Sequence, residues 1–258
     1  MHRKAALPVV LWLVLSPSLL SCGRPASETT LARIQRTRVL EVGTDATYPP
    51  FESIDPATAR PAGFDIDLMR EVAVRLGAEA RFENVPFEGI LPALRSGKYD
   101  AVISAMTITE ERAREVQFSR PYYAAGQSIC VAAGSAIETP EELRGKRIGV
   151  QLGTTGERTA KTIAEASVVS FDAIGAAFLD LRNGHLDAVI ADTPTARLFA
   201  SDHPDIRLTG EPITRESYGI AMRKTDPDLA AAIDAALEAM EREGKIAALR
   251  EAWKLPAP

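Results

Sequence analysis

The sequence predicts an α/β protein of two similar lobes, each with a mainly parallel sheet flanked by helices. Apolar strand patterns alternate with amphipathic helix patterns along the chain, and this alternation starts again after residue 126. The two parts share an ungapped pattern, SGKYDAVISAMT at 96–107 and NGHLDAVIADTP at 183–194. Such an internal repeat indicates two copies of one folding unit. In an open parallel sheet, a ligand binds at the carboxyl ends of the strands.

The first 21 residues are typical of an export signal. Arg3 and Lys4 precede a largely apolar stretch over residues 5–20, which two prolines interrupt. A stretch of roughly 16 residues is short for a membrane span and fits the apolar region of a signal peptide. The protein is therefore expected to be exported.

The sequence LLSC at 19–22 resembles a bacterial lipobox. It predicts that Cys22 becomes the lipidated first residue of the mature protein, and that residues 22–29 form a polar tether. The alternative is an ordinary signal peptide with an incidental cysteine. The chain has one other cysteine, Cys130. If Cys22 is lipidated, Cys130 has no cysteine to pair with, so we expect no intramolecular disulfide. We expect Cys130 to be buried in the core.

Composition limits the classes of partner. The chain has 258 residues, of which 46% are hydrophobic, enough for one large or two modest domains. Removal of residues 1–21 takes two of the 30 basic side chains, so that 28 face 35 acidic ones and the net charge is −7. This balance is not typical of nucleic-acid binding. The three histidines are too scattered to suggest a metal site, and no dinucleotide fingerprint occurs, so we expect neither metal nor cofactor.

The first part of the mature chain alternates clearly between helix and strand patterns. The helix over 63–76 closes at Gly77, and its core face holds Ile66, Met69, Val72, Ala73 and Leu76. The other expected elements are a short helix followed by a strand within 31–45, a strand at 80–86, a helix at 87–100 and a strand at 101–105.

The second part repeats this order. A strand is expected at 127–134, then a strand, a Gly-rich turn and a helix within 145–165, and then helix, turn, strand, loop and helix within 177–200. The chain continues with a strand at 218–224 and one or two amphipathic helices over 227–254.

Arg112 stands where helix electrostatics disfavour it. Thr109 is the expected N-cap of a helix whose first turn contains Glu110 and Glu111. A cation in that turn is disfavoured by a few tenths to about 1 kcal/mol unless it binds an anion there. Arg112 therefore marks a candidate anion site, the alternative being a surface ion pair with Glu115 at i+3.

Five segments in register carry a family resemblance. They are GTDATYPPFE at 43–52, GFDIDLMREVAVRL at 63–76, SAMTITEER at 104–112, FSRPYYAAGQ at 118–127 and VQLGTTGE at 150–157. Together they resemble the landmarks of the bacterial extracellular solute-binding proteins, family 3, which are polar amino-acid receptors of ABC importers. The resemblance covers about residues 36–255.

The resemblance implies a two-lobed periplasmic-binding-protein fold of type II, in which two crossover hinge strands join the lobes. The crossings are expected near 122–125 and 217–219. Lobe 1 would then comprise residues 30–123 plus 219–258, and lobe 2 residues 124–218.

The resemblance also places a ligand's α-carboxylate on Arg112, because a planar guanidinium can bond both carboxylate oxygens. The segment QLGTTGE leaves a strand and enters a helix, so Thr154 and Thr155 are expected to add N–H and hydroxyl donors from lobe 2. The alternative is that these threonines only cap the helix.

The ammonium group of the ligand needs acceptors. By resemblance these are Asp192, the hydroxyl of Thr107 and a backbone carbonyl such as that of Ala105. A carboxylate opposite a bound ammonium is a charge-assisted pair worth about 1.5–3 kcal/mol. The alternative role of Asp192 is to cap the helix that follows it.

Recognition of the ligand side chain is expected from Asp45, Tyr48, Phe87, Ser104 and Gln151. The two aromatic rings would enclose an aliphatic stem, unless they are ordinary core residues. A carboxylate at Asp45 favours a distal amide, guanidinium or ammonium and repels a second carboxylate. The expected ligand is therefore a basic amino acid or glutamine.

The implied protein is a monomeric, lipid-anchored binding protein in the periplasm or at the outer face of the cytoplasmic membrane, which delivers its ligand to an ABC transporter permease. An alternative is a cyclohexadienyl or arogenate dehydratase on a similar fold, with Glu157 as general acid. A further alternative is the ligand-sensing domain of a larger receptor or cell-wall enzyme. We expect no second module after the last helix, which disfavours this alternative.

Overall fold

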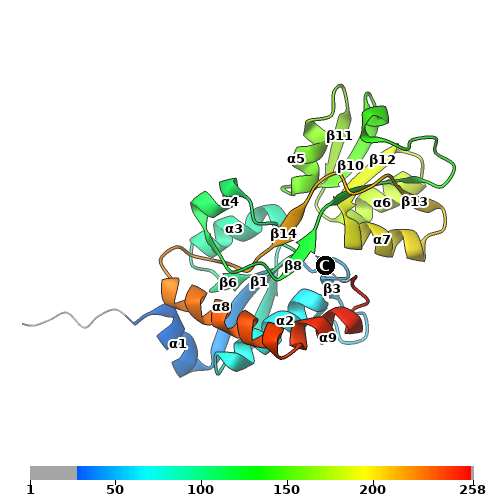
Figure 1. Ribbon diagram of the computed structural model, residues 1–258. Coiled ribbons are helices and arrows are strands. Elements are labelled where there is room, and N and C mark those ends of the chain that lie inside the picture. The colour runs from blue at the N-terminus through cyan, green and yellow to red at the C-terminus, as the bar shows by residue number, and fades with distance from the viewer. Residues whose placement is uncertain (1–27, 257–258) are drawn as a thin grey trace, which may run out of the picture.

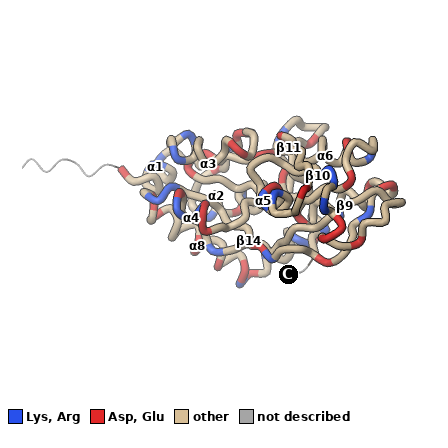
Figure 2. The backbone as a smooth tube through the Cα atoms, turned by 90° about the horizontal axis from the view of Figure 1, so that it is seen from above, with Lys and Arg blue, Asp and Glu red and all other residues tan. Residues whose placement is uncertain are grey.

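The computed structural model describes residues 28–256, and Figure 1 shows two lobes joined by a pair of strands. The predicted signal peptide, the lipidation at Cys22 and most of the predicted tether lie outside the described residues. None of the described helices is both long and apolar enough to cross a membrane. Acidic and basic residues alternate along the backbone in both lobes, with no large region of one charge (Figure 2).

Lobe 1 contains a five-stranded sheet in the order β5-β1-β6-β15-β7. Its strands are β1 (Val39–Thr44), β5 (Glu79–Asn84), β6 (Ala101–Val102), β7 (Gln117–Phe118) and β15 (Ala221–Met222). Its helices are α1 (Thr30–Thr37), α2 (Phe64–Arg75), α3 (Phe87–Arg95), α4 (Glu110–Glu115), α8 (Pro227–Arg242) and α9 (Lys245–Ala252). A small antiparallel sheet is added by β2 (Thr47–Tyr48), β3 (Glu52–Ile54) and β4 (Pro61–Ala62).

Lobe 2 contains a second five-stranded sheet in the order β11-β10-β12-β9-β13. Its strands are β9 (Gln127–Ala132), β10 (Arg147–Gln151), β11 (Ser167–Phe171), β12 (Ala188–Asp192) and β13 (Ile206–Thr209). Its helices are α5 (Thr155–Lys161), α6 (Ile174–Arg182), α7 (Thr193–Asp202) and the 3-10 turn η1 (Pro140–Leu143). The lobes are joined by β8 (Tyr123–Ala125) and β14 (Glu216–Tyr218), which pair antiparallel.

Each large sheet is mainly parallel, as the sequence predicts, and contains one reversed strand among its five. In lobe 1, β1 pairs parallel with β5 and β6, but β15 runs antiparallel to β6 and β7. In lobe 2, β9 runs antiparallel to β12 and β13. The reversed strands β9 and β15 follow the two joining strands. A chain that arrives from the other lobe enters at the carboxyl end of the parallel strands and must run the opposite way.

The repeated sequence motif builds the same local structure twice. Gly97 and Gly184 both have positive φ, 84° and 75°, and end the preceding helices. The carboxylates of Asp100 and Asp187 then accept hydrogen bonds from the N–H groups of Glu41 and Arg147 at 3.0 and 2.8 Å. Each aspartate thereby fixes the repeat to the first parallel strand of its own lobe.

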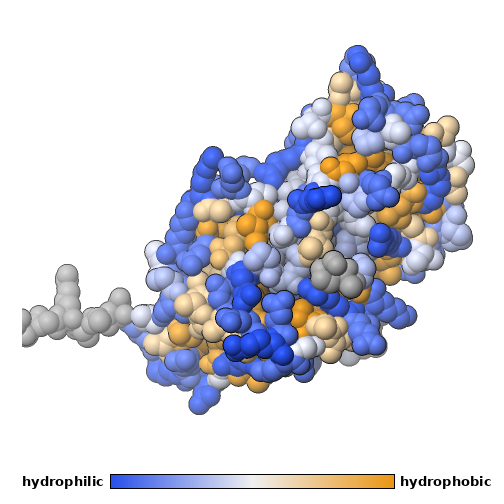
Figure 3. All heavy atoms as spheres, in the orientation of Figure 1, coloured by the Kyte–Doolittle hydropathy of each residue, from blue (hydrophilic) through white to orange (hydrophobic). Residues whose placement is uncertain are grey.

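The sequence patterns explain the cores of both lobes. Ile66, Met69, Val72 and Ala73 of α2 are fully buried, as their helical spacing predicts. Cys130 is also buried, in the sheet of lobe 2. The visible surface carries hydrophilic residues around smaller hydrophobic areas (Figure 3).

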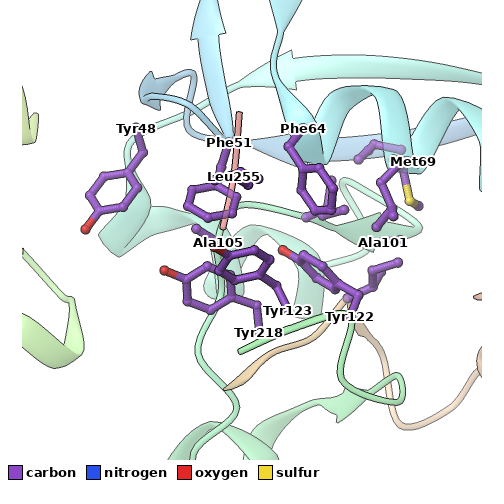
Figure 4. Packing of buried hydrophobic residues seen from close by; sticks show 14 of the residues in the cluster. Tyr48, Phe51, Phe64, Met69, Ala101, Ala105, Tyr122, Tyr123, Tyr218 and Leu255 are labelled. Carbon is purple, nitrogen blue, oxygen red and sulfur yellow. The ribbon is translucent and has the colours of Figure 1, made fainter. Parts of the chain in front are cut away.

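An aromatic cluster holds the joining strands against lobe 1 (Figure 4). Tyr123 of β8 stacks on Tyr218 of β14 with ring centroids 5.7 Å apart. Phe51 packs edge-on against both rings at 5.1 and 5.2 Å. Aromatic pairs of this geometry are worth about 0.5–1.5 kcal/mol each beyond their burial, so this end of the hinge is firmly attached to lobe 1.

Candidate functional site

The main candidate site is a cavity between the lobes. It lies at the carboxyl ends of the parallel strands, as the fold class predicts. Lobe 1 and lobe 2 both contribute to its lining, which consists of Tyr48, Phe87, Ser104, Ala105, Thr107, Arg112, Gln151, Thr154, Thr155 and Asp192. All ten residues belong to the predicted ligand-binding set. The eleventh, Asp45, does not line the cavity.

Arg112 enters the cavity from the first turn of α4. The hydroxyl of Thr109 caps this helix by accepting a hydrogen bond from the Arg112 N–H at 3.2 Å. The guanidinium donates to the carbonyls of Thr107 at 2.8 Å and Gly153 at 3.0 Å, and lies 5.2 Å from the ring centroid of Phe87. Two of its five N–H donors are thus used, and three are left for an anion.

The alternative of a surface ion pair for Arg112 is wrong. Glu115 instead accepts a hydrogen bond from Arg95 at 2.7 Å. Burial, with the nearby charge of Arg158, lowers the pKa of Arg112 to about 10, so the guanidinium is charged at neutral pH. A half-buried cation of this kind gains most from an anionic partner.

The start of α5 faces Arg112 from lobe 2. The Thr154 hydroxyl accepts from the Glu157 N–H at 3.2 Å and donates to the Gln151 carbonyl at 2.7 Å, so this side chain caps the helix. The Thr155 hydroxyl instead donates to Glu216 at 2.8 Å. Backbone N–H groups in the first turn of a helix have no acceptors within the helix. Those at the start of α5 are therefore the donors that lobe 2 offers to an anion held by Arg112.

Asp192 is buried at the end of β12. Its carboxylate accepts from the Tyr48 hydroxyl at 2.5 Å and from the Gln127 amide at 2.8 Å. Burial, together with the charge of Glu216, raises the pKa of Asp192 to about 7, although the bond from Tyr48 and the charge of Arg112 oppose this shift.

Asp192 also holds the N-cap position of α7, but its side chain makes no capping bond. The helix begins at Thr193, directly after the strand, so the loop expected between them is absent. The Asp192 carboxylate therefore does not cap α7 and lines the cavity between the lobes.

A second buried acid, Asp45, lies directly behind the cavity lining. Asp45 accepts from the Thr47 hydroxyl at 2.8 Å and from the Gln151 amide at 2.7 Å, so it lies one hydrogen bond behind the lining. Burial raises the pKa of Asp45 to about 6, while these two bonds oppose the shift. Gln151 belongs to lobe 2 and Asp45 to lobe 1, and their contact is one of the bonds that cross the cleft.

A pair of fully buried acids supports the floor of the site. The Ser104 hydroxyl donates to Glu52 at 2.9 Å, and the Ala105 N–H donates to Asp65 at 2.7 Å. Burial raises the pKa of Asp65 to about 7. Burial, with the charge of Asp65, also raises the pKa of Glu52 well above its usual range. Ala105 has a φ of 40°, a conformation that L-residues disfavour and that these bonds hold in place.

Sequence reasoning missed four residues around the cavity, namely Glu52, Asp65, Gln127 and Glu216. Asp65 belongs to the segment 63–76 and stands between the apolar residues Phe64 and Ile66 in the first turn of α2, where it is buried. An acid between two apolar residues of a core helix was a usable signal in the sequence. Gln127 and Glu216 lie on or beside the joining strands, and nothing in their sequence context distinguishes them from surface polar residues.

Glu157 does not fit the general acid of the dehydratase alternative. It does not line the cavity, and its carboxylate accepts from the Gly153 N–H, the Ser170 hydroxyl and Lys161. Burial alone would raise its pKa, but the bonds from Lys161, Ser170 and Gly153 hold it below the usual range. A general acid at neutral pH needs the opposite shift.

No group of His, Cys, Asp and Glu suited to a metal ion occurs within residues 28–256. The site combines one guanidinium, helix N–H groups and two aromatic rings with the carboxylate of Asp192, and further carboxylates lie directly behind this lining, between two hinged lobes. Fold and site together define a two-lobed binding protein that encloses a small polar ligand. The profile of the bacterial extracellular solute-binding proteins, family 3, matches residues 40–256, and the chain belongs to this family.

Several members of the family are similar over most of their length. The "ABC transporter arginine-binding protein 1" of Escherichia coli is 36% identical over 220 residues, 83% of this chain and 90% of the relative. The "ABC transporter glutamine-binding protein GlnH" of Bacillus subtilis is 35% identical over 235 residues, 89% of this chain and 86% of the relative. A crystal structure of a mutant ArgBP from T. maritima has a TM-score of 0.83 at 42% identity and covers 86% of this chain and 98% of that chain.

One similar structure bears on the enzyme alternative. The ancestral amino acid-binding protein AncCDT-1, described as a precursor of cyclohexadienyl dehydratase, has a TM-score of 0.82 at 38% identity. It covers 87% of this chain and 99% of that chain. The similarity is thus to an amino acid-binding precursor, and the relatives described above are binding proteins. The family is extracellular, so this chain functions outside the cytoplasm.

Proposed function

We propose that the protein binds a basic amino acid of the arginine type between its lobes and delivers it to the permease of an ABC importer. One observation carries the proposal: a half-buried cation, Arg112, and a buried carboxylate, Asp192, face one cavity from different lobes. A free amino acid presents the complementary pair of charges on one carbon atom. Arg112 and Asp192 are therefore the pair of groups that a site for a zwitterion requires.

In this proposal Arg112 and the start of α5 bind the α-carboxylate. Asp192 and the Thr107 hydroxyl accept from the ammonium group, while Tyr48 and Phe87 enclose the aliphatic stem. The distal group meets Gln151, Ser104 and, behind them, Asp45. Direct contact between the ligand and these residues is part of the proposal.

The charge balance supports a cationic ligand. Asp192 is buried in the cavity lining, Asp45 is buried behind Gln151, and Glu216 lies next to Thr107 and Thr155 of the lining. Arg112 is the cation among the lining residues. Glutamine would leave this excess of acid uncompensated at the distal end, whereas arginine adds a positive charge there.

The proposal makes the protein a receptor without catalytic activity, in which no residue acts as the proton donor of a dehydratase. It further assigns residues 30–123 plus 219–258 to lobe 1 and 124–218 to lobe 2, with the protein acting as a monomer. A lipid on Cys22 would anchor it at the outer face of the membrane. In support, α1 lies at the end of lobe 1 away from lobe 2, where an anchor leaves closure free (Figure 1).

The test is calorimetric titration of the refolded mature protein with L-arginine, L-glutamine, L-glutamate, prephenate and agmatine, which is arginine without its carboxylate. We expect tight binding of L-arginine, weaker binding of L-glutamine, and none of the others. Arg112→Ala should weaken arginine binding at least about 100-fold, because hydrogen bonds to charged groups contribute about 1.5–3 kcal/mol each.

Arg158→Ala is the matched control. Arg158 is a neighbouring cation that pairs with exposed Glu111 across the cleft and does not line the cavity, so its loss should change affinity less than about threefold. Binding of agmatine as tight as that of arginine, or an Arg112→Ala protein with wild-type affinity, would exclude the zwitterion site. Conversion of prephenate would favour the enzyme alternative.

A further inference from the structure

Glu216 is an acidic residue next to the cavity to which the proposed function gives no contact with the ligand. It begins β14, one of the two strands that join the lobes. It does not line the main cavity, yet its side chain bonds two residues that do. Thr107 belongs to lobe 1 and Thr155 to lobe 2, and both hydroxyls donate to the same oxygen, Oε2 of Glu216, at 2.8 Å.

The remaining bonds fix the carboxylate in this position. Oε1 accepts from the Thr214 hydroxyl at 2.9 Å, and Oε2 also receives the Gln127 amide at 3.4 Å. The Gln127 amide donates to Thr155 at 3.1 Å and to Asp192 at 2.8 Å as well. Glu216 is therefore held by groups from both lobes and from the hinge.

The consequence for the two threonines follows from the chemistry of a hydroxyl, which has one proton and two lone pairs. Since Thr107 and Thr155 both use their proton on Glu216, neither can donate to a ligand. Toward the cavity they present lone pairs only. Asp192, the third group on this side, is a carboxylate that accepts hydrogen bonds when ionised.

We propose that Glu216 is a positioning residue that makes this side of the site accept hydrogen bonds only, and thereby selects ligands with a protonated α-amino group. The inference rests on the proposed function and deepens it. An ammonium group has three N–H donors and satisfies Thr107 and Asp192 together. An α-hydroxy acid of the same shape has a single O–H donor in place of three N–H donors, and an α-keto acid has none, so at least one of these buried acceptors is left unpaired.

The same arrangement explains why Thr155 does not serve the ligand carboxylate through its hydroxyl, as the sequence led us to expect. Its proton is committed to Glu216. The carboxylate is left to Arg112 and the backbone N–H groups of α5, so the two ends of the zwitterion are read by groups of opposite hydrogen-bonding character.

The test compares L-arginine with L-argininic acid, in which a hydroxyl replaces the α-amino group, for wild type, Glu216→Ala and Glu216→Gln. The measured quantity is the ratio of the two dissociation constants. In Glu216→Ala the threonine hydroxyls are free to turn and donate to the hydroxyl ligand. We expect arginine affinity to fall roughly 10- to 100-fold and the ratio to fall at least about tenfold.

Glu216→Gln keeps the shape of the side chain. Its amide oxygen can take the place of Oε2, and its NH₂ group then faces the Thr214 hydroxyl, which can accept. We expect this variant to keep the wild-type ratio within about threefold, a rescue that a merely structural loss would not show. Ser217→Ala, next along β14, controls for changes in the strand itself.

The outcomes separate cleanly. A ratio unchanged in Glu216→Ala, or lowered equally in Glu216→Gln, overturns the proposal. Failure of the wild type to bind L-arginine overturns the proposed function and this inference with it. If Glu216→Ala does not fold, Thr107→Val replaces it, because loss of the oriented hydroxyl should lower the ratio in the same way; an unchanged ratio there also overturns the proposal.

Discussion

Single side chains in this protein stand where local rules disfavour them. Arg112 is a cation in the first turn of a helix, and Ala105 has a left-handed backbone conformation beside it in the cavity lining. Asp192 ends a buried strand without capping the helix that follows. Each departure carries a cost that the rest of the structure must offset. All three residues meet at the cavity.

In the proposed function, Asp45 sets the preference for the distal group of the ligand. We expect Asp45→Asn to weaken L-arginine binding roughly 10- to 100-fold, because a charge-assisted bond becomes a neutral one, and to change L-glutamine binding less than about threefold. Glu88→Gln is the matched control, since Glu88 is an exposed acid whose charge acts on Asp45 from outside the lining. Equal losses for both ligands would show that Asp45 does not read the distal charge. Calorimetric titration measures both.

Binding should weaken in acid because the ammonium group needs the ionised form of Asp192. With a pKa of about 7, this carboxyl gains a proton as the pH falls, so the affinity for L-arginine should decrease below pH 7 and approach a tenfold loss per pH unit. Asp45, with a pKa of about 6, adds a second loss below pH 6. Titrations between pH 5 and 8 test this.

At pH 7 binding should also release protons, which titration in buffers of different ionisation enthalpy detects. Asp192→Asn should bind weakly and lose the dependence that centres on pH 7. An affinity constant between pH 5 and 8 would mean that the ligand does not contact this carboxylate.

At this scale the sequence predicted the lining well, because Arg112, Asp192, Tyr48 and their partners follow strand ends or helix starts that local patterns reveal. It did not reveal Glu216 or Gln127. Their role depends on two segments far apart in the chain that pair only in the folded hinge, and a polar residue beside a short strand has no local signature.

Elements were predicted where the pattern was long and periodic. The helices α2, α8 and α9 and the strands β1, β10 and β12 were expected close to where they lie. The strands β11 and β13 were missed. The burial of β11 alternates weakly, since Ser167, Val169 and Ser170 do not face the core, and such a sheet-edge strand has little hydrophobic signal.

The contact between β3 and α2 makes stability depend on pH. Glu52 and Asp65 have pKa values raised in the folded state, so their contribution is present below the unfolded values near 4 and is lost as the pH rises. Glu52→Gln keeps an acceptor for Ser104 and removes one ionisation. Relative to wild type, its free energy of unfolding should therefore increase with pH by up to about 1.4 kcal/mol per unit between pH 5 and 7.

Urea unfolding at several pH values measures this difference. Glu41→Gln is a control on the surface of the same lobe, because Glu41 forms a partly exposed salt bridge with Arg81. If the difference in free energy of unfolding between Glu52→Gln and wild type does not vary with pH, the pKa of Glu52 is not raised in the folded protein.

At the scale of the whole molecule, the two lobes contact each other through residues of the site. Tyr48 bonds Asp192, Gln151 bonds Asp45, and the guanidinium of Arg112 reaches Gly153. A ligand that replaces or joins these bonds gains most when the lobes are closed, so it shifts the equilibrium toward the closed form.

We therefore expect saturating L-arginine to lower the radius of gyration measured by small-angle X-ray scattering, or to leave it at the closed value, and to raise the free energy of unfolding by about 2.7 kcal/mol at 100 times its dissociation constant. Agmatine lacks the carboxylate that would bind Arg112, so it should change neither the radius of gyration nor the free energy of unfolding. An expansion with arginine would contradict closure around the ligand.

The position of β15 inside the lobe 1 sheet sets an order for folding. Lobe 2 takes its sheet from one continuous stretch, 127–209. In the sheet of lobe 1, by contrast, β7 pairs with β15 alone among the described strands, and β15 pairs Ala221 with both Val102 and Phe118. A chain made from its N-terminus can therefore complete the second lobe while the first still lacks an inner strand. Contacts between residues so far apart in sequence form slowly. The first lobe to emerge is the last to be finished.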